Sequence, residues 1–88
     1  MTNERLIKIF TEIKDEKQME KFFLEIFTEK ELIDLSLRWR LLADLHKNKT
    51  QREIAKKYHI SLCKITRGSK ILKKKNSIIK KILDNKET

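Results

Sequence analysis

The chain has 88 residues, 39% of them hydrophobic, with one Cys, one Gly, no Pro and a net charge of +9 at pH 7. This length allows one domain at most, the single Cys63 excludes an internal disulfide and fits a reducing cytoplasm, and no apolar run approaches the ~20 residues needed to cross a bilayer. Charged residues from Glu4 onward argue against a secretory signal peptide, so we expect a cytoplasmic protein. The scarcity of Gly and Pro favours an all-helical fold.

Apolar residues at helical spacing predict two helices in the first part of the chain. One is expected over residues 3–14 and the other over Met19 to Phe27, with the polar run Lys14 to Gln18 as the junction between them. All 4 Phe residues of the chain stand in this part. An aromatic stripe at this spacing is more typical of a core or a dimer interface than of a ligand pocket.

Thr28 and Glu31 form a capping box that begins a third and longest helix, which we expect to end near Lys47, with Asn48 as its stop. Apolar residues cover most of this helix's circumference, so it must be enclosed, and in so short a chain a second copy is the obvious partner. Opposite charges at i, i+4 spacing predict two ion pairs on its surface, Asp34 with Arg38 and Arg40 with Asp44.

The stretch from Thr50 to Leu72 predicts two short helices joined by a tight turn, a helix-turn-helix. Thr50 and Glu53 form a second capping box, in which the Thr oxygen accepts a free amide proton of the first turn and the Glu is expected to reach back. His59 falls at the turn, and Ser61 is a suitable N-cap for the second helix. The alternative is an ordinary helical hairpin with a solvated basic face.

A polar break after Leu72 separates this pair from a last helix over residues 76–84, for which Asn76 is the expected N-cap. We therefore predict a single domain, residues 1–88, of about six helices. Residues 1–47 would form a dimerisation core, residues 50–72 the helix-turn-helix and residues 76–84 a C-terminal helix.

The charge is divided unevenly along the chain. Residues 1–45 hold 8 basic and 10 acidic residues, a net of −2, whereas residues 46–88 hold 14 basic and 3 acidic residues, a net of +11. The positive excess therefore lies in and after the helix-turn-helix, where a polyanion would bind, and this favours a DNA-binding unit over a plain hairpin. A basic membrane-surface helix is less favoured, because Lys73 to Lys75 lack flanking aromatic residues.

Two short motifs, TQREIA from Thr50 and ITRGS from Ile65, follow the upstream segment FTEKELIDLSLRWRLL from Phe27. With these motifs at this separation, the chain resembles the tryptophan operon repressor family over roughly residues 22–74. The resemblance implies an intertwined all-helical homodimer that represses genes of tryptophan biosynthesis or uptake. It also implies that L-tryptophan, the corepressor, raises affinity for double-stranded operator DNA.

The resemblance also implies a set of ligand-binding residues. Arg38 and Arg67 would flank the indole, one of them pairing with the carboxylate, and Gly68 would let the flat ring approach the backbone. Ile71 stands where familiar family members carry a small Ser. The positions that surround the corepressor are matched by Arg38, Arg67, Thr28, Gly68, Leu42, Phe27, Glu25 and Ile71.

The residues expected to meet DNA lie in and just after the helix-turn-helix. Lys64 and Thr66 would face base edges, and Gln51 would contact either bases or phosphates. The expected phosphate-binding residues are Arg52, Lys56, Lys70 and Lys73.

Cys63, His46 and His59 show no metal-ligand spacing, so we expect neither a metal nor an enzyme. Two alternatives remain open. One is a DNA-binding relative without a tryptophan switch, and the other is a basic helical module that binds acidic protein or RNA.

Overall fold

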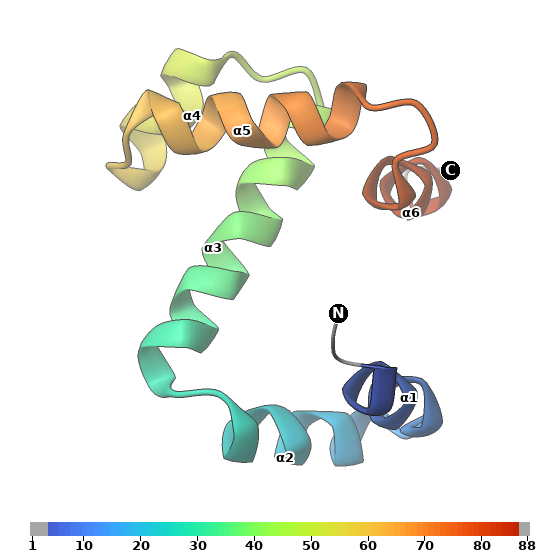
Figure 1. Ribbon diagram of the computed structural model, residues 1–88. Helices are drawn as coiled ribbons and strands as arrows, with labels where there is room; N and C mark the ends of the chain where they lie inside the picture. The colour runs from blue at the N-terminus through green and yellow to red at the C-terminus, as the bar shows by residue number, and fades with distance from the viewer. Residues whose placement is uncertain (1–3, 87–88) are drawn as a thin grey trace. The chain divides into compact units, whose positions relative to one another are not determined.

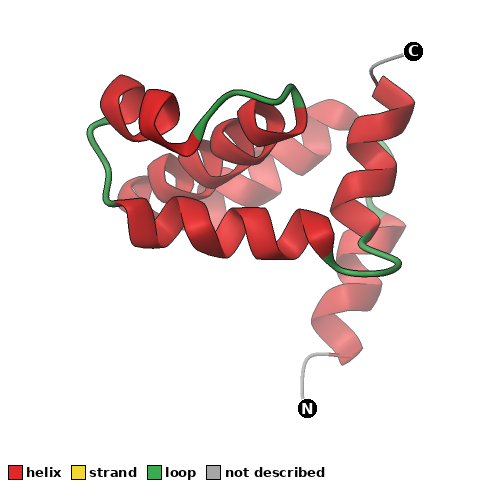
Figure 2. Cartoon of the chain, turned by 90° about the horizontal axis from the view of Figure 1, so that it is seen from above, coloured by secondary structure: helices red, strands yellow, loops and turns green. Residues whose placement is uncertain are grey.

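The computed structural model describes residues 4–86, and in this range it contains α-helices and no strand (Figures 1 and 2). The prediction of an all-α fold is confirmed. The predicted start of the first helix, residue 3, lies outside the described residues. The helices of the described range are α1 (Glu4–Glu12), α2 (Glu16–Ile26), α3 (Glu29–His46), α4 (Gln51–Tyr58), α5 (Leu62–Lys73) and α6 (Ile78–Lys86).

The chain divides into two units, Met1–Asp34 and Leu35–Thr88, and α3 begins in the first and continues into the second. In the first unit, aromatic rings join α1 to α2. The Phe10 ring lies 5.1 Å from the Phe22 ring and 6.0 Å from the Phe23 ring, both edge to face. These rings are half-buried, which agrees with the packing role predicted for the Phe stripe.

Side chains at the helix starts explain where α2 and α3 begin. The Asp15 carboxylate accepts the Gln18 amide proton at 3.2 Å, so α2 begins at Glu16, three residues before the predicted Met19. The Thr28–Glu31 capping box is formed as predicted, with the Thr28 amide donating to the Glu31 carboxylate at 2.8 Å and the Glu31 amide donating to the Thr28 hydroxyl at 3.1 Å. Hydrogen bonding to the Glu31 carboxylate, from the Thr28 amide first and then from the Thr28 hydroxyl, favours the ionised acid and lowers the pKa of Glu31.

The second unit has a small apolar core to which α3, α4, α5 and α6 all contribute. Ile54 and Ile65 are completely buried, and they pack with residues of α3 and α6. In Figure 1, α4 and α5 lie side by side, and α6 follows α5 after a short loop. The buried apolar residues are Leu41, Leu42, Ile54, Ile65 and Leu83.

The structure corrects the predictions for the last helix and for both ion pairs of α3. Within residues 4–86, Asp34 and Arg38 do not form the predicted pair. Asn76 adopts a left-handed conformation with φ 65°, and the Ser77 hydroxyl, not Asn76, accepts the Lys80 amide proton at 3.2 Å. The predicted pair of Arg40 with Asp44 is wrong, because the Asp44 carboxylate points to α4 instead. Asn48 ends the third helix as predicted, with φ 67°.

Candidate functional site

The local conformation at the start of α4, at the end of α4 and at the start of α5 determines the shape of the helix-turn-helix. The Thr50 hydroxyl accepts the Glu53 amide proton at 3.1 Å and begins α4. The Glu53 carboxylate reaches back to Thr50 as predicted and accepts its hydroxyl proton at 3.1 Å. His59 ends α4 in the left-handed region at φ 55°, as expected at the turn. Ser61 occupies the N-cap position of α5 with extended backbone, but its side chain makes no capping hydrogen bond.

Close packing fixes α5 against α3. A Cβ atom at Gly68 would lie 2.8 Å from Leu41 Cδ1, 3.2 Å from Leu45 Cδ1 and 3.3 Å from Leu42 Cδ2. Gly68 therefore permits an approach of the two helices so close that a side chain at this position would require the Leu41 side chain to shift. In this structure, leucine side chains of α3 fill the space beside Gly68.

The opposite face of α5 is exposed and positively charged. A surface hollow of about 360 Å³ on this face is lined by Leu62, Cys63, Thr66, Arg67 and Lys70. Within residues 4–86, the predicted DNA-binding cations form no ion pair, whereas Lys49, Lys57 and Lys80 each pair with an acid. The exposed and unpaired side chains at predicted DNA positions are those of Arg52, Lys56, Lys64, Lys70 and Lys73.

Gln51 and Thr66, two of the residues predicted to contact DNA bases, lie beside each other on the neighbouring helices α4 and α5. The Thr66 hydroxyl lies 3.2 Å from Gln51 Oε1 and 2.9 Å from the Leu62 carbonyl oxygen. A hydroxyl has one proton, which the nearer carbonyl of Leu62 attracts. Thr66 is therefore left to meet a base edge through its methyl group and its oxygen lone pairs.

Sequence reasoning missed a polar cluster that joins the end of α3 to the end of α4. The Asp44 carboxylate accepts the Tyr58 hydroxyl proton at 2.7 Å and lies 3.4 Å from Lys57 Nζ and 3.7 Å from Lys49 Nζ. Burial opposes the ionisation of Asp44, but the hydrogen bonds from Tyr58 and Lys57 outweigh it, so the pKa of Asp44 is lowered. Burial and the bond to Asp44 raise the pKa of Tyr58. Only the long spacing between residues 44 and 58 hid this pair from a local pattern search.

The residues expected to bind L-tryptophan are divided between the two units. Arg38 is exposed and forms no ion pair within the described chain, and Arg67 lies on the exposed face of α5. Ile71 packs against the core of the second unit. The remaining expected residues of the second unit are Leu42 and Gly68, and those of the first unit are Glu25, Phe27 and Thr28.

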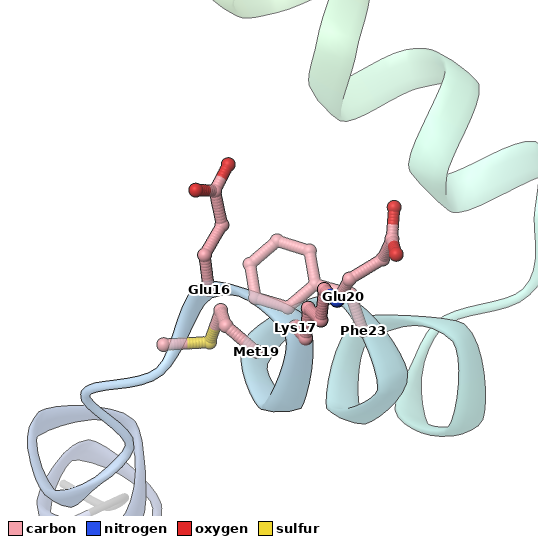
Figure 3. Close-up of a pocket in the computed structure, with 5 residues that line it drawn as sticks. All are labelled: Glu16, Lys17, Met19, Glu20 and Phe23. Carbon is pink, nitrogen blue, oxygen red and sulfur yellow. The ribbon is translucent and has the colours of Figure 1, made fainter.

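A further hollow of about 500 Å³ lies on α2 and is lined by Glu16, Lys17, Met19, Glu20 and Phe23. Figure 3 shows the Glu16 and Glu20 carboxylates on either side of the Phe23 ring. None of the residues predicted to bind tryptophan or DNA lines this hollow.

Residues 4–86 include no group of three His, Cys, Asp or Glu side chains placed to hold a metal ion. No helix in that range has the length and apolar character required to cross a membrane.

The fold and the exposed basic helix define the class: an all-helical protein that carries a helix-turn-helix. Residues 2–87 match the model of the family described as Trp repressor protein, and the chain belongs to this family. Members of the family are transcriptional regulators that bind DNA as dimers, and the family is not an enzyme class.

Several relatives carry the name Trp operon repressor homolog. That of Chlamydia caviae is 35% identical over 80 residues, which cover 90% of this chain and 79% of the relative. That of Xylella fastidiosa is 38% identical over 74 residues, covering 83% and 80%, and that of Chlamydia trachomatis serovar D is 38% identical over 69 residues, covering 73% of each chain. No solved structure gives a significant match.

Proposed function

We propose that this Trp-repressor-like regulator binds operator DNA as a homodimer in the cytoplasm and represses genes of tryptophan biosynthesis or uptake when L-tryptophan is bound. One observation carries the DNA-binding part of the proposal. Lys49, Lys57 and Lys80 pair with Asp44 or Asp84, whereas within residues 4–86 the cations at the predicted DNA positions are exposed and unpaired. Cationic side chains without acidic partners, on and beside a helix that contacts DNA bases, attract the phosphates of the DNA backbone.

The roles proposed for individual side chains follow from their surroundings. Lys64 and Thr66 meet base edges, with Gln51 beside Thr66. Arg52, Lys56, Lys70 and Lys73 hold phosphates, which position the protein without reading sequence.

The dimer is supported by apolar side chains that the single chain leaves exposed. On α3, Ile33 is 60% exposed and Trp39 38%, and on α6, Ile78 is 70% exposed. A second copy of the chain would cover such surfaces, and a dimer would place two reading helices about 34 Å apart, the spacing of successive major grooves. Sedimentation of the purified protein tests this step: we expect a dimer, and a stable folded monomer contradicts it.

The corepressor role is supported by the chemistry of the matching residues. Among residues 4–86, the guanidinium groups of Arg38 and Arg67 have no acidic partner, and each has the planar form that stacks on an indole or pairs with a carboxylate. The Thr28 hydroxyl accepts the Glu31 amide proton at the start of α3, and we propose that the same hydroxyl meets the ligand carboxylate. Backbone carbonyls near Glu25 and Phe27 would accept the ammonium group. Leu42 and Gly68 would line the slot for the indole.

A second candidate, a DNA-binding relative without a tryptophan switch, is favoured by two observations. The partly buried Ile71 stands where a small Ser is familiar, and Leu41, Leu42 and Leu45 fill the space beside Gly68. In this alternative the protein is a dimer, and its DNA affinity does not change when tryptophan is added.

The proposed DNA contacts are tested by replacing one exposed lysine at a time. Lys70→Ala should weaken binding to all duplexes similarly and reduce the slope of log affinity against log salt by about one. Lys81→Ala on α6 removes the same charge from a residue outside the reading face and should leave the slope nearly unchanged. A loss with Lys70→Ala for one sequence alone, or the same change with Lys81→Ala, contradicts the phosphate role.

A further inference from the structure

Asp44 is the one buried charged residue in the described part of the chain, with 7% of its surface exposed. It lies near the end of α3, and its carboxylate receives the Tyr58 hydroxyl proton at 2.7 Å. Tyr58 is the last residue of α4. Together with the Lys57 ammonium group, which lies 3.4 Å from the same carboxylate, this bond joins α3 to the end of the first helix of the helix-turn-helix.

Stability alone does not explain a carboxylate at this position. Removing a charge from water is costly, and an apolar side chain of similar volume stabilises such a site at least as well as a paired charge. A hydrogen bond differs from apolar packing because it requires a particular distance and angle. The Asp44–Tyr58 bond thus supplies orientation that the contacts of Ile54 with the core do not supply.

The bond acts at the point where the chain turns from α4 into α5. Tyr58 is followed by His59, whose left-handed conformation sets the direction of the turn. The Ile60 amide donates to the Ala55 carbonyl at 3.2 Å and closes the end of α4. Fixing Tyr58 to α3 therefore also fixes the start of α5, which carries the proposed reading residues.

We propose that Asp44 and Tyr58 are positioning residues that hold the helix-turn-helix on α3 in the absence of any ligand. The proposal rests on the proposed DNA-binding function. The Asp44–Tyr58 hydrogen bond, called the Asp44–Tyr58 anchor below, determines how strongly DNA binding depends on tryptophan. With the anchor intact, a larger share of molecules already has a docked helix-turn-helix, so tryptophan tightens DNA binding by a smaller factor than it does when the anchor is absent. With the anchor removed, tryptophan must supply the docking, and the dependence on tryptophan increases.

Two variants remove the anchor in different ways. Tyr58→Phe keeps the ring and deletes the hydroxyl, which is expected to weaken the docking equilibrium about tenfold or more. Asp44→Asn keeps the shape and deletes the charge. Asp44→Asn also raises the net charge by one, and this change alone would strengthen DNA binding. Weaker binding by this variant therefore cannot be caused by the change in net charge.

Asp84→Asn is the matched control. It deletes a carboxylate that pairs with His46 at 2.6 Å and Lys80 at 3.0 Å, and it raises the net charge by the same amount. Asp84 lies on α6, outside the helix-turn-helix. Its replacement reports on the general effect of losing a surface ion pair.

The experiment measures binding of the full chain and its variants to a duplex that the wild type selects from a random library, with and without saturating L-tryptophan. Without tryptophan, Tyr58→Phe and Asp44→Asn should bind about tenfold more weakly than the wild type. With tryptophan the deficit should fall to less than about threefold. Asp84→Asn should show no such difference. An equal deficit under both conditions, which a purely structural role would give, or no deficit at all, overturns the proposal.

Hydrogen exchange on the free proteins separates the anchor from the proposed function. In Tyr58→Phe and Asp44→Asn, peptides from α4 should exchange faster, while peptides from α6 remain as in the wild type. If the wild type selects no duplex or ignores tryptophan, the proposed function fails, and faster exchange confined to α4 still supports the anchor. Unchanged exchange in α4 overturns the anchor regardless of DNA binding.

Discussion

Replacing Ile65 with Ala should destabilise the protein more than any change on the exposed face of the same helix. Ile65 has 0% exposed surface and lies in a core with few other buried residues, so its truncation leaves a cavity bordered by Ile54. Truncation of a fully buried Ile costs about 2–5 kcal/mol. Small domains are stable by only about 5–15 kcal/mol, so this loss would be a large fraction of the total.

Urea unfolding at a fixed protein concentration measures this loss, with Trp39, the single Trp of the chain, as the fluorescent reporter. Cys63→Ala is the matched control, because Cys63 lies on the same helix and is exposed. The control should change the free energy of unfolding by less than about 0.5 kcal/mol. A loss below about 1 kcal/mol for Ile65→Ala, or an equal loss for both variants, refutes the assigned core.

Two further predictions concern the capping of α4 and the pH dependence of stability. Thr50→Ala removes the hydrogen-bond acceptor at the start of α4 and should lower the free energy of unfolding in urea by about 1 kcal/mol. Thr11→Ala is the control and should cost clearly less, because the Thr11 hydroxyl only donates to a carbonyl of α1. Equal costs for the two variants would contradict the capping role. Hydrogen bonds from His46 first, and then from Lys80, lower the pKa of Asp84 below its usual 3.8. The ionised carboxylate therefore stabilises the fold fully above pH 3.8, and this stabilisation is lost as the pH falls through the lower pKa of Asp84 in the folded state. Unfolding measured against pH should therefore show a stability difference between the wild type and Asp84→Asn that shrinks in acid, and a difference independent of pH would exclude this linkage.

Features decided by neighbours in the sequence could be predicted. The Thr28–Glu31 capping box and the left-handed His59 both depend on residues within one helical turn, and both were found. The errors at helix starts were small and had local causes. Asp15 begins α2 earlier than the apolar pattern indicates, and Ser77 rather than Asn76 caps the last helix.

Features decided by tertiary packing could not be predicted in the same way. The i, i+4 rule assigned Asp44 to Arg40, but burial of Asp44 against α4 gave it Tyr58 as a closer partner. His46 and Asp84 pair across 38 positions, a separation for which a single sequence carries no pattern. The close approach at Gly68 likewise depends on which leucines of α3 face α5.

The resemblance to the family, rather than periodicity, supplied the ligand-binding residues. Local sequence patterns alone would predict a surface charge on a helix for Arg38 and a phosphate contact for Arg67. Their proposed joint role depends on positions matched to the family motif. The corepressor site therefore stays a prediction, whereas membership of the Trp repressor family is established.

The most direct test of the account is titration of the selected duplex with the purified full chain, with and without L-tryptophan. We expect specific binding that falls steeply with salt and becomes tighter when tryptophan is present. The same affinity with and without tryptophan would contradict the corepressor role, and failure to bind any duplex at moderate salt would contradict DNA binding itself.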